Sequence, residues 1–319
     1  MARSSAAAAD DDATQIGPPI SAETREVLRR LELDVTRRLD GLLHGDHRGL
    51  VPGHGSELGE TRRYAPGDDV RRIDWNVTAR LPEAHIRQTI AERELQTWIV
   101  VDRSPRLAFG TAQGEKRDLV TAATAAVGFL TNRDGNRIGA VFAGAGEPSV
   151  IPPRGSRQHL LRLLHDVATP PPADGAGTTD LGAALGHVSS IASRRGLVVV
   201  VSDFLVAPGW ERALQILARR QELLAIQVTD PRDAELPNVG LVALRDPATG
   251  KVREVATNKR KVRERFAAAA AERQEALAAE LRRNRVEHLV LSTDRPWLDD
   301  LVRFVGNRKR RMGFYGGRA

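Results

Sequence analysis

The chain has 319 residues, 41% of them hydrophobic and 28% charged, which is the composition of a globular protein rather than of a disordered chain. It has no cysteine, which excludes disulfide scaffolds, thiol catalysis and metal sites with cysteine ligands. No run approaches the roughly 18 uninterrupted apolar residues of a membrane span, and a secretory signal pattern is absent, so we expect a cytoplasmic protein. Lys and Arg number 48 against 41 Asp and Glu, and this net charge of +7 permits a polyanionic ligand without requiring one.

The first part of the chain has little regular patterning. Residues 1–20 hold an alanine run, three consecutive aspartates and two prolines, so we expect a disordered tail. From Ser21, apolar residues recur at helical spacing and predict an amphipathic helix that ends in the glycine-rich stretch following it. Residues 45–75 hold too many Gly and Pro for one regular element, which predicts a long loop or short strands. Ile86 and Ile90 then fit an alternating strand that leads towards the core.

From Gln96 onward, buried apolar strands alternate with helices. We predict strands at 97–102, 137–142, 149–151, 196–203, 223–229 and 287–291, and helices at 115–132, 156–167, 180–194, 210–220, 258–284 and from 297. A hairpin with strands at 241–245 and 251–255 interrupts the alternation. Apolar strands separated by helices imply a sheet covered on both faces. Residues 96–308 are therefore predicted to form a doubly wound, mostly parallel α/β domain, preceded by a helix and an irregular Gly-rich segment at 21–95 and followed by a basic tail at 309–319.

Polar side chains follow several of these strands. Asp102 and Ser104 come directly after the first strand, Asp203 ends the central strand, and Thr179 and Asp180 precede a helix. Ligands of such sheets bind beyond the carboxyl ends of the strands, so we expect these three loops to converge. Their oxygen atoms suit a hard divalent cation such as Mg²⁺. Side chains that merely cap backbone amides at strand-to-helix turns are the alternative.

The three loops resemble the metal-ion-dependent adhesion site of von Willebrand factor A domains, whose usual motif is Asp-x-Ser-x-Ser followed by a Thr and an Asp on later loops. The resemblance is carried by Asp102-Arg-Ser104-Pro-Arg106, Thr179-Asp-Leu181 and Ser202-Asp203. It implies that Asp102, Ser104, Thr179 and Asp203 bind Mg²⁺ or Mn²⁺, with an acidic partner side chain as a further ligand. Arg106 stands where the third residue is normally Ser, and a guanidinium has no lone pair for a cation. The competing interpretation is a pseudo-site in which Arg106 neutralises the two aspartates or points to solvent.

A second resemblance lies upstream. Arg63-Tyr-Ala-Pro-Gly-Asp-Asp-Val-Arg-Arg-Ile-Asp-Trp75, followed by Thr78-Ala-Arg80 and Glu92-Arg-Glu94, resembles the signature of the bacterial domain-of-unknown-function family fifty-eight. This resemblance covers about residues 25–305 and implies a von Willebrand A-like domain with a MoxR-type AAA+ ATPase as partner. The signature segment either is pinned on the main domain by Arg–carboxylate pairs or docks a partner. The partner-binding candidates are Tyr64, Arg71, Asp74 and Trp75, together with Arg106 and Asp180.

Enzyme signatures are lacking: the chain has no GxSxG, no P-loop, no HExxH, and no GxGxxG after a strand. We therefore expect a non-catalytic protein-interaction module that works with the AAA+ ATPase in chaperone-like remodelling or metal insertion of client proteins, through a degenerate metal-ion-dependent adhesion site. The alternative is a basic nucleic-acid-binding protein that uses its arginine surface and the run at 308–311. A metal-dependent phosphohydrolase at the same strand ends is a further alternative.

Overall fold

A computed structural model describes residues 22–43, 61–65, 70, 73–80, 83–87, 95–132, 136–169, 178–246 and 249–315. The predicted disordered tail at 1–20 lies outside the described residues. The elements in chain order are α1 (Ala22–Leu43), β1 (Thr61–Arg63), α2 (Trp75–Thr78), β2 (His85–Arg87), β3 (Gln96–Asp102), the 3₁₀ turn η2 (Pro105–Leu107), α3 (Lys116–Thr131), β4 (Arg137–Ala143), β5 (Ser149–Arg154), α4 (Arg157–Ala168), α5 (Leu181–Ile191), β6 (Leu197–Ser202), α6 (Trp210–Ala218), β7 (Glu222–Thr229), α7 (Pro231–Ala234), β8 (Leu241–Arg245), β9 (Val252–Ala256), α8 (Arg260–Arg283), β10 (Glu287–Ser292) and α9 (Trp297–Tyr315).

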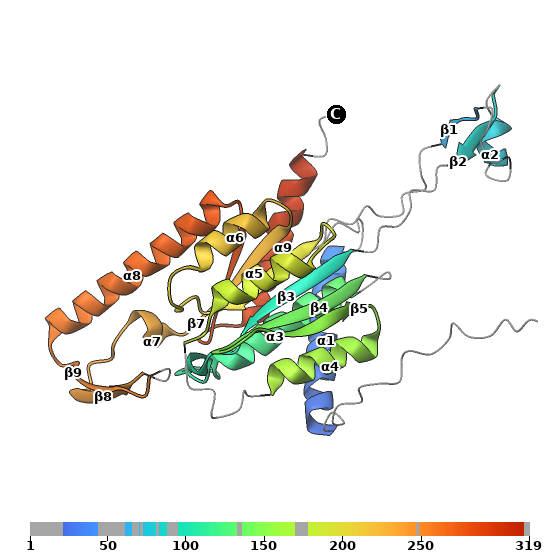
Figure 1. The fold of residues 1–319 in the computed structure, drawn as a ribbon. Helices are drawn as coiled ribbons and strands as arrows, with labels where there is room; N and C mark the ends of the chain where they lie inside the picture. The colour runs from blue at the N-terminus through green and yellow to red at the C-terminus, as the bar shows by residue number, and fades with distance from the viewer. Residues whose placement is uncertain are drawn as a thin grey trace, which may run out of the picture.

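A six-stranded sheet in the order β10-β7-β6-β3-β4-β5 forms the centre of the molecule (Figure 1). All neighbouring strands pair in parallel except β4 and β5, which pair antiparallel at one edge. Every residue of β6 is buried, because helices cover both faces of the sheet. The strand order reverses between β3 and β6, so the topological switch point lies between these two strands. The predicted doubly wound, mostly parallel α/β fold is confirmed.

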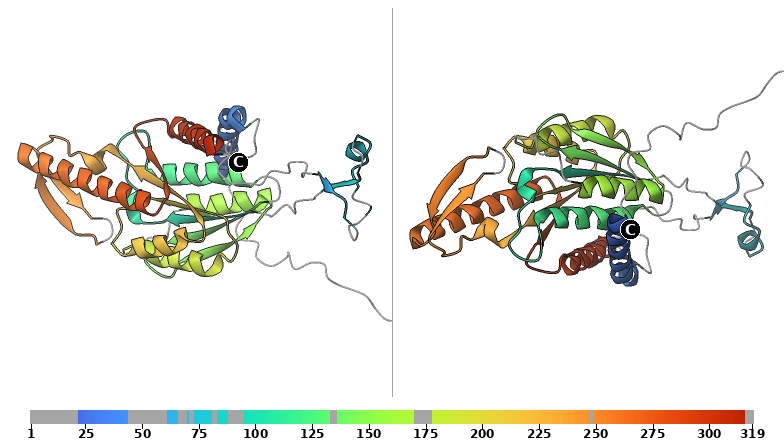
Figure 2. Two further views of the ribbon diagram at one scale, coloured as in Figure 1. Left: turned by 90° about the horizontal axis from the view of Figure 1, so that it is seen from above. Right: turned by 90° about the horizontal axis from the view of Figure 1, so that it is seen from below.

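The two faces of the sheet carry separate apolar cores, as the views along the sheet show (Figure 2). On one face, α3, α4 and α9 pack against the strands, and α1 lies across these helices. Leu28 and Val35 of α1 are fully buried there, which explains the helical spacing of its apolar residues. On the other face, α5, α6 and the end of α8 contribute Leu185, Trp210 and Leu281. The predicted N-terminal helix is thus part of the main domain's core.

Two boundaries differ from the predicted ones. The edge strand β5 is longer than predicted and runs through Pro152 and Pro153, which an edge strand tolerates because its outer side pairs with no neighbour. The expected basic tail begins as helix, because α9 continues to Tyr315. Arg308 in that helix is only 3% exposed and pairs with Glu222 and Glu287, which anchors the helix on β7 and β10. The first residues of the basic run therefore belong to the fold.

Part of the signature segment forms a small unit of its own. β1 and β2 pair antiparallel, and α2 follows Asp74, whose carboxylate accepts a hydrogen bond from the Val77 amide. Arg63 pairs with Glu83 across this unit, at 2.6 Å. The prediction of short strands within 45–75 is confirmed for β1. The predicted strand through Ile86 is present as β2, which pairs with β1, whereas Ile90 and Arg71 lie outside the described residues. The expectation that the segment is pinned on the main domain stays a prediction.

The β8–β9 hairpin and α8 extend from one end of the sheet (Figure 1). The predicted hairpin is present, with Leu241 opposite Ala256 and Arg245 opposite Val252. Within α8 only Ala270 and Leu281 are buried, so most of this long helix faces solvent. Among the described residues, none of the helices is both long and apolar enough to cross a membrane.

Candidate functional site

The candidate site lies where β3 and β6 end side by side. These strands pair in parallel with Val101 opposite Val201, so Asp102 and Ser202 come next to each other at the carboxyl edge. This edge is the topological switch point, the usual ligand position in doubly wound sheets. The 3₁₀ turn η2 after β3 then carries Arg106 back over the strand ends. The predicted convergence of the first and third loops is therefore present.

Asp102 is buried and hydrogen-bonded through both carboxylate oxygens. Oδ1 accepts from the Ser104 amide at 2.7 Å, and Oδ2 accepts from the Ser202 hydroxyl at 2.6 Å. Burial, followed by the nearby charge of Asp203, raises the pKa of the Asp102 carboxyl, although both hydrogen bonds and Arg106 act in the opposite direction. The fold thus holds Asp102 in place at an electrostatic cost.

Asp203 is equally buried, and a lysine neutralises it. Its Oδ1 accepts from the Leu205 amide at 2.9 Å, and its Oδ2 lies 3.0 Å from Nζ of Lys116, the first residue of α3. Lys116 also contacts Asp233 of α7, at 3.1 Å, and its own side chain is 2% exposed. The residue after Asp203, Phe204, has a positive φ of 55°, which marks the sharp turn that positions the loop.

Arg106 approaches both aspartates without a hydrogen bond to either. Its Nη2 lies 3.9 Å from Oδ2 of Asp102 and 3.7 Å from Oδ1 of Asp203. Within the described part of the chain, its buried Nε and Nη2 have no acceptor, and its side chain remains 17% exposed. Of the pseudo-site interpretations, the one in which Arg106 faces the two aspartates agrees with this geometry.

The second of the three predicted loops, with Thr179 and Asp180, makes no described hydrogen bond to Asp102 or Asp203. The Asp180 amide donates to Gly144 at the end of β4, and the Asp180 side chain caps α5 by accepting from the Ala183 amide. Asp180 is exposed, whereas Thr179 is 3% exposed. No hydrogen bond joins Thr179 to Asp102 or Asp203 in the described structure. The capping role that the sequence left open for these side chains is the one that Asp180 has.

The donor set does not fit a divalent cation. Such a cation needs several oxygen ligands that face it, yet each carboxylate oxygen of Asp102 and Asp203 already accepts from a donor of the chain. Lys116 and Arg106 bring two positive charges to the same place. Ser104 Oγ is the one feature that suits a metal, because it is buried and has no partner among the described residues. No group of three or more His, Asp or Glu side chains with metal-binding geometry occurs in the described ranges.

Sequence reasoning missed Lys116 and Asp233. Lys116 is the first residue of α3 and does not directly follow a strand, and Asp233 lies in a short helix after β7. Neither residue therefore belongs to a motif that the sequence analysis considers. Nearby, Asp230 accepts hydrogen bonds from Thr111 and Thr293 and from the Thr111 amide. Burial alone would raise the pKa of Asp230, but these hydrogen bonds outweigh it and lower the pKa. The loop that leads to Lys116 is therefore fastened to the ends of β7 and β10.

The remaining candidates lie in the small β1–β2 unit. Trp75 is 70% exposed, Tyr64 and Asp74 are half-buried, and Arg71 lies outside the described residues. No contact described for these residues reaches Asp102 or Arg106. Their grouping with Arg106 as one partner-binding surface stays a prediction.

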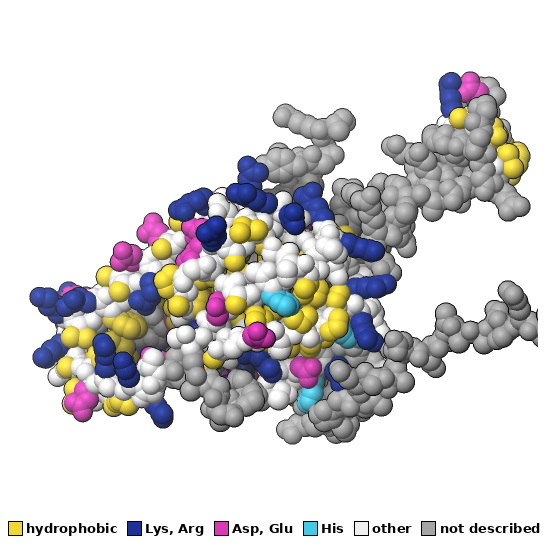
Figure 3. All heavy atoms as spheres, in the orientation of Figure 1, with side chains coloured by type: hydrophobic (Ala, Val, Ile, Leu, Met, Phe, Trp, Pro, Cys, Tyr) yellow, Lys and Arg dark blue, Asp and Glu magenta, His cyan; other side chains and the backbone are white. Residues whose placement is uncertain are grey.

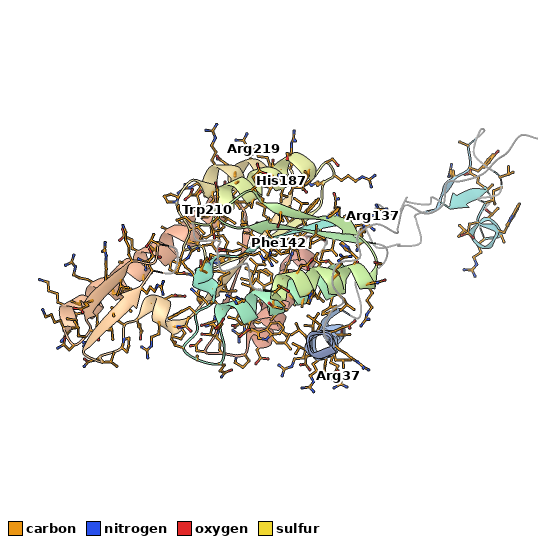
Figure 4. The ribbon with its side chains drawn as sticks, turned by 60° about the horizontal axis from the view of Figure 1, so that its bottom comes forward. Arg37, Arg137, Phe142, His187, Trp210 and Arg219 are labelled. Atoms are coloured by element: carbon orange, nitrogen blue, oxygen red, sulfur yellow. The ribbon has the colours of Figure 1, made fainter. Side chains whose placement is uncertain are left out.

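The carboxyl edge and its opposite end are distinguishable in the side-chain view (Figure 4). Trp210, at the start of α6, lies towards the end that carries the candidate site, while Arg137 begins β4 at the other end. Gly182 brings the starts of α5 and α6 together, since a side chain there would approach Trp210 and Gly209 within 3.5 Å. The starts of α5 and α6 thus lie together, and the start of α3 contributes Lys116 to the site.

Fold and site together define an α/β protein with a doubly wound, mostly parallel sheet and a group of charged side chains at its switch point. Residues 60–276 match the family model described as "Protein of unknown function DUF58", and the chain belongs to this family. An uncharacterized protein of Mycobacterium tuberculosis is 50% identical over 283 residues, 89% of each chain. An uncharacterized protein of Mycobacterium avium is 42% identical over 160 residues, 50% of this chain and 94% of that protein. The predicted family membership is confirmed.

Similar solved structures include the conserved hypothetical protein BatB from Bacteroides thetaiotaomicron, with 13% identity and a TM-score of 0.45 over 68% of this chain and 99% of BatB. The VWA domain of SpRpn10 is 14% identical, with a TM-score of 0.37 over 66% of this chain and 94% of that domain.

Proposed function

We propose that this chain is a non-catalytic protein-interaction module that binds an acidic side chain of a partner protein at the carboxyl edge of its sheet. The partner implied by the family resemblance is a MoxR-type AAA+ ATPase, with which the chain acts in chaperone-like remodelling or metal insertion of client proteins. The ATPase supplies hydrolysis, and this chain supplies recognition.

The observation that carries the proposal is the state of Arg106. Its side chain lies at the switch point and is 17% exposed, and the carboxylate oxygens of Asp102 and Asp203, at 3.9 and 3.7 Å from Nη2, are too far for hydrogen bonds. Nε and Nη2 are buried without an acceptor among the described residues, so the side chain has to turn outward to pair with a ligand carboxylate through both donors. The exposed indole of Trp75 adds a second surface of the type found in binding hot spots.

The strand-end hydroxyls favour binding over catalysis. Ser202 donates to the Asp102 carboxylate but is fully buried, so a substrate does not reach its hydroxyl, and Ser104 Oγ is buried without a hydrogen-bond partner among the described residues. The described His159 and His288 hydrogen-bond to Ile138 and Gln227, away from the site. An activated nucleophile needs a base within hydrogen-bonding reach. Phosphatase turnover that Asp102→Asn abolishes would contradict a non-catalytic role and favour the phosphohydrolase alternative.

The test measures binding between this chain and a MoxR-type ATPase from the same genome. Arg106→Ala is expected to weaken binding at least about tenfold, a loss of about 1.4 kcal/mol, because a charged pair at an interface centre is lost. Arg219→Ala is the matched control, since this exposed arginine follows α6 and precedes Glu222, the residue with which β7 begins at the amino edge of the sheet. Equal affinity of both variants and the parent chain would contradict the proposal, as would absence of binding.

A second candidate function, binding of a nucleic acid, is favoured by the charge of the projecting hairpin and helix. Residues 245–265 hold eight Lys and Arg against three Asp and Glu, in a chain whose total is +7. Basic side chains gather at that end of the molecule (Figure 3). The C-terminal basic run is a less suitable binding element, because Arg308 is buried and paired.

This alternative predicts retention on duplex DNA that falls steeply with salt. Lys259→Glu combined with Lys261→Glu is expected to abolish retention, whereas Arg194→Glu with Arg195→Glu, an exposed pair elsewhere, is expected to leave most of it. Weak retention that both double variants reduce equally would reflect net charge alone and would exclude a dedicated nucleic-acid surface.

A further inference from the structure

The least expected group at the candidate site is the ammonium of Lys116. A side chain that is 2% exposed and charged must be paired, and Lys116 lies within 3.2 Å of carboxylate oxygens from two different loops. Asp203 directly follows β6, and Asp233 lies in the short helix α7 after β7. Lys116, at the start of α3, thus contacts Oδ2 of Asp203, whereas Arg106 faces Oδ1 of the same carboxylate.

The two cations face the two aspartates at the strand ends, and Lys116 is shared with a third carboxylate, the partly exposed Asp233. Asp203 has Lys116 at 3.0 Å from its Oδ2 and Arg106 at 3.7 Å from its Oδ1, while Asp102 has Arg106 at 3.9 Å. One divalent cation between these aspartates would supply the same total charge as the ammonium and the guanidinium do. Since both cations belong to the chain, positive charge stands beside Asp102 and Asp203 without any ion from solution.

We propose that Lys116 and Arg106 replace the divalent cation that the adhesion-site resemblance implies, so that this site recognises a carboxylate without metal. A cation approaching Asp102 and Asp203 meets two positive charges and carboxylate oxygens that already accept hydrogen bonds. Arg106, the more exposed of the two, provides the charge for the ligand, and Lys116 pairs with Asp203 on the other side. The ligand class is a carboxylate side chain on a protein.

This inference deepens the proposed function, yet its main test needs no partner. Calorimetric titration with Mn²⁺ is expected to give no binding heat for the parent chain. Arg106→Ser places an oxygen ligand where the resemblance expects one, and Arg106→Ser with Lys116→Gln removes both charges. The double variant is expected to bind Mn²⁺, and adding Asp102→Asn is expected to abolish that binding. Lys261→Gln, an exposed lysine on α8, serves as the matched control and is expected to behave as the parent.

Two outcomes would overturn the inference. The first is Mn²⁺ binding by the parent chain that Asp102→Asn removes, since the site would then be an ordinary metal site. The second is a folded double variant that still binds no Mn²⁺, since the two cations would then not be what excludes the metal. Circular dichroism establishes whether each variant is folded.

The Arg106→Ser single variant keeps the Lys116 ion pairs and covers the case in which the double variant does not fold. Its melting temperature is expected to rise with Mn²⁺, because a ligand that binds only the folded state stabilises it, whereas that of the parent is expected to stay constant. No rise in the single variant would then count against the inference. In the complex, capture of the ATPase is expected to be the same with and without a chelator, because no metal takes part. Failure of capture itself would contradict the proposed function and would leave the Mn²⁺ result intact.

Discussion

Lys116 neutralises two carboxylates that the core cannot otherwise accommodate. Lys116→Met keeps most of the side-chain volume but leaves Asp203 and Asp233 without their cation. Breaking a buried ion pair in this way typically destabilises a protein by about 3–5 kcal/mol. We expect a decrease near the lower end of that range, because Asp233 is partly exposed. Urea unfolding measures the change, and Lys261→Met is the control.

Adding Asp203→Asn to Lys116→Met is expected to recover part of this stability, since the uncompensated charge is then removed. If the two substitutions destabilise additively, the ion pair seen in the structure contributes nothing and the assignment of Lys116 is wrong.

The raised pKa of Asp102 has a consequence for stability against pH. The folded state binds the Asp102 proton more tightly than the unfolded chain does, because the pKa is raised on folding. This proton therefore adds to the free energy of unfolding below the pKa of the unfolded chain, and the added stability is lost as pH rises through the folded pKa. Asp102→Asn removes this loss, and the amide oxygen can still accept from the Ser104 amide. The urea midpoint of the variant, relative to that of the parent, is therefore expected to increase from acidic to neutral pH. A constant difference across this range would show that Asp102 has an ordinary pKa.

At the residue scale, the sequence predicts the site only where a side chain follows a strand. Asp102, Ser104 and Asp203 are found in this way, because the ends of parallel strands lie at one edge. Lys116 is not found, because its position depends on how α3 is placed over the sheet rather than on any spacing. Arg106 is recognised as a departure from the motif, but its distance from each carboxylate requires the structure.

At the scale of elements, two glycines with opposite surroundings test how the edge strand is held. A side chain at Gly139 of β4 would lie 2.8 Å from the Ile151 carbonyl oxygen and 3.0 Å from the nitrogen of Pro153, both backbone atoms of β5. Gly139→Ala is therefore expected to destabilise the protein by about 1–3 kcal/mol. Gly186 in α5 has open space around it, so Gly186→Ala is expected to stabilise by about 0.5–1 kcal/mol. Thermal unfolding compares the two, and equal effects would show that β5 does not pack closely on β4.

The boundaries of the helices and strands show where the local sequence alone predicts an element correctly. Strands such as β6 are predicted well, since a run of valines with no polar residue has few alternatives. The extension of α9 into the basic run is not predicted, because Arg308 is held by Glu222 of β7 and Glu287 of β10. Those partners are distant in sequence, and no helical period in residues 308–311 indicates them.

At the scale of the whole molecule, the alternation of strands and helices predicts the doubly wound class, whereas the strand order requires the structure. The sequence does not show that α1 lies over α3 rather than on the sheet, since an amphipathic stripe fits either surface. It also does not show that the hairpin and α8 extend away from the two cores. These arrangements depend on which apolar faces remain uncovered after the sheet forms.

The molecule is therefore expected to have uneven local stability. β8 and β9 form a two-stranded sheet with Leu241 and Val252 at least 60% exposed, whereas β6 lies between two cores. An isolated hairpin is marginally stable in water, so its amides should open by local fluctuation. Hydrogen exchange followed by mass spectrometry is expected to show rapid exchange in 241–256 and exchange only by global unfolding in 197–202. Equal protection of both segments would mean that the hairpin is covered, by a second copy or another surface, in the protein as it exists in solution.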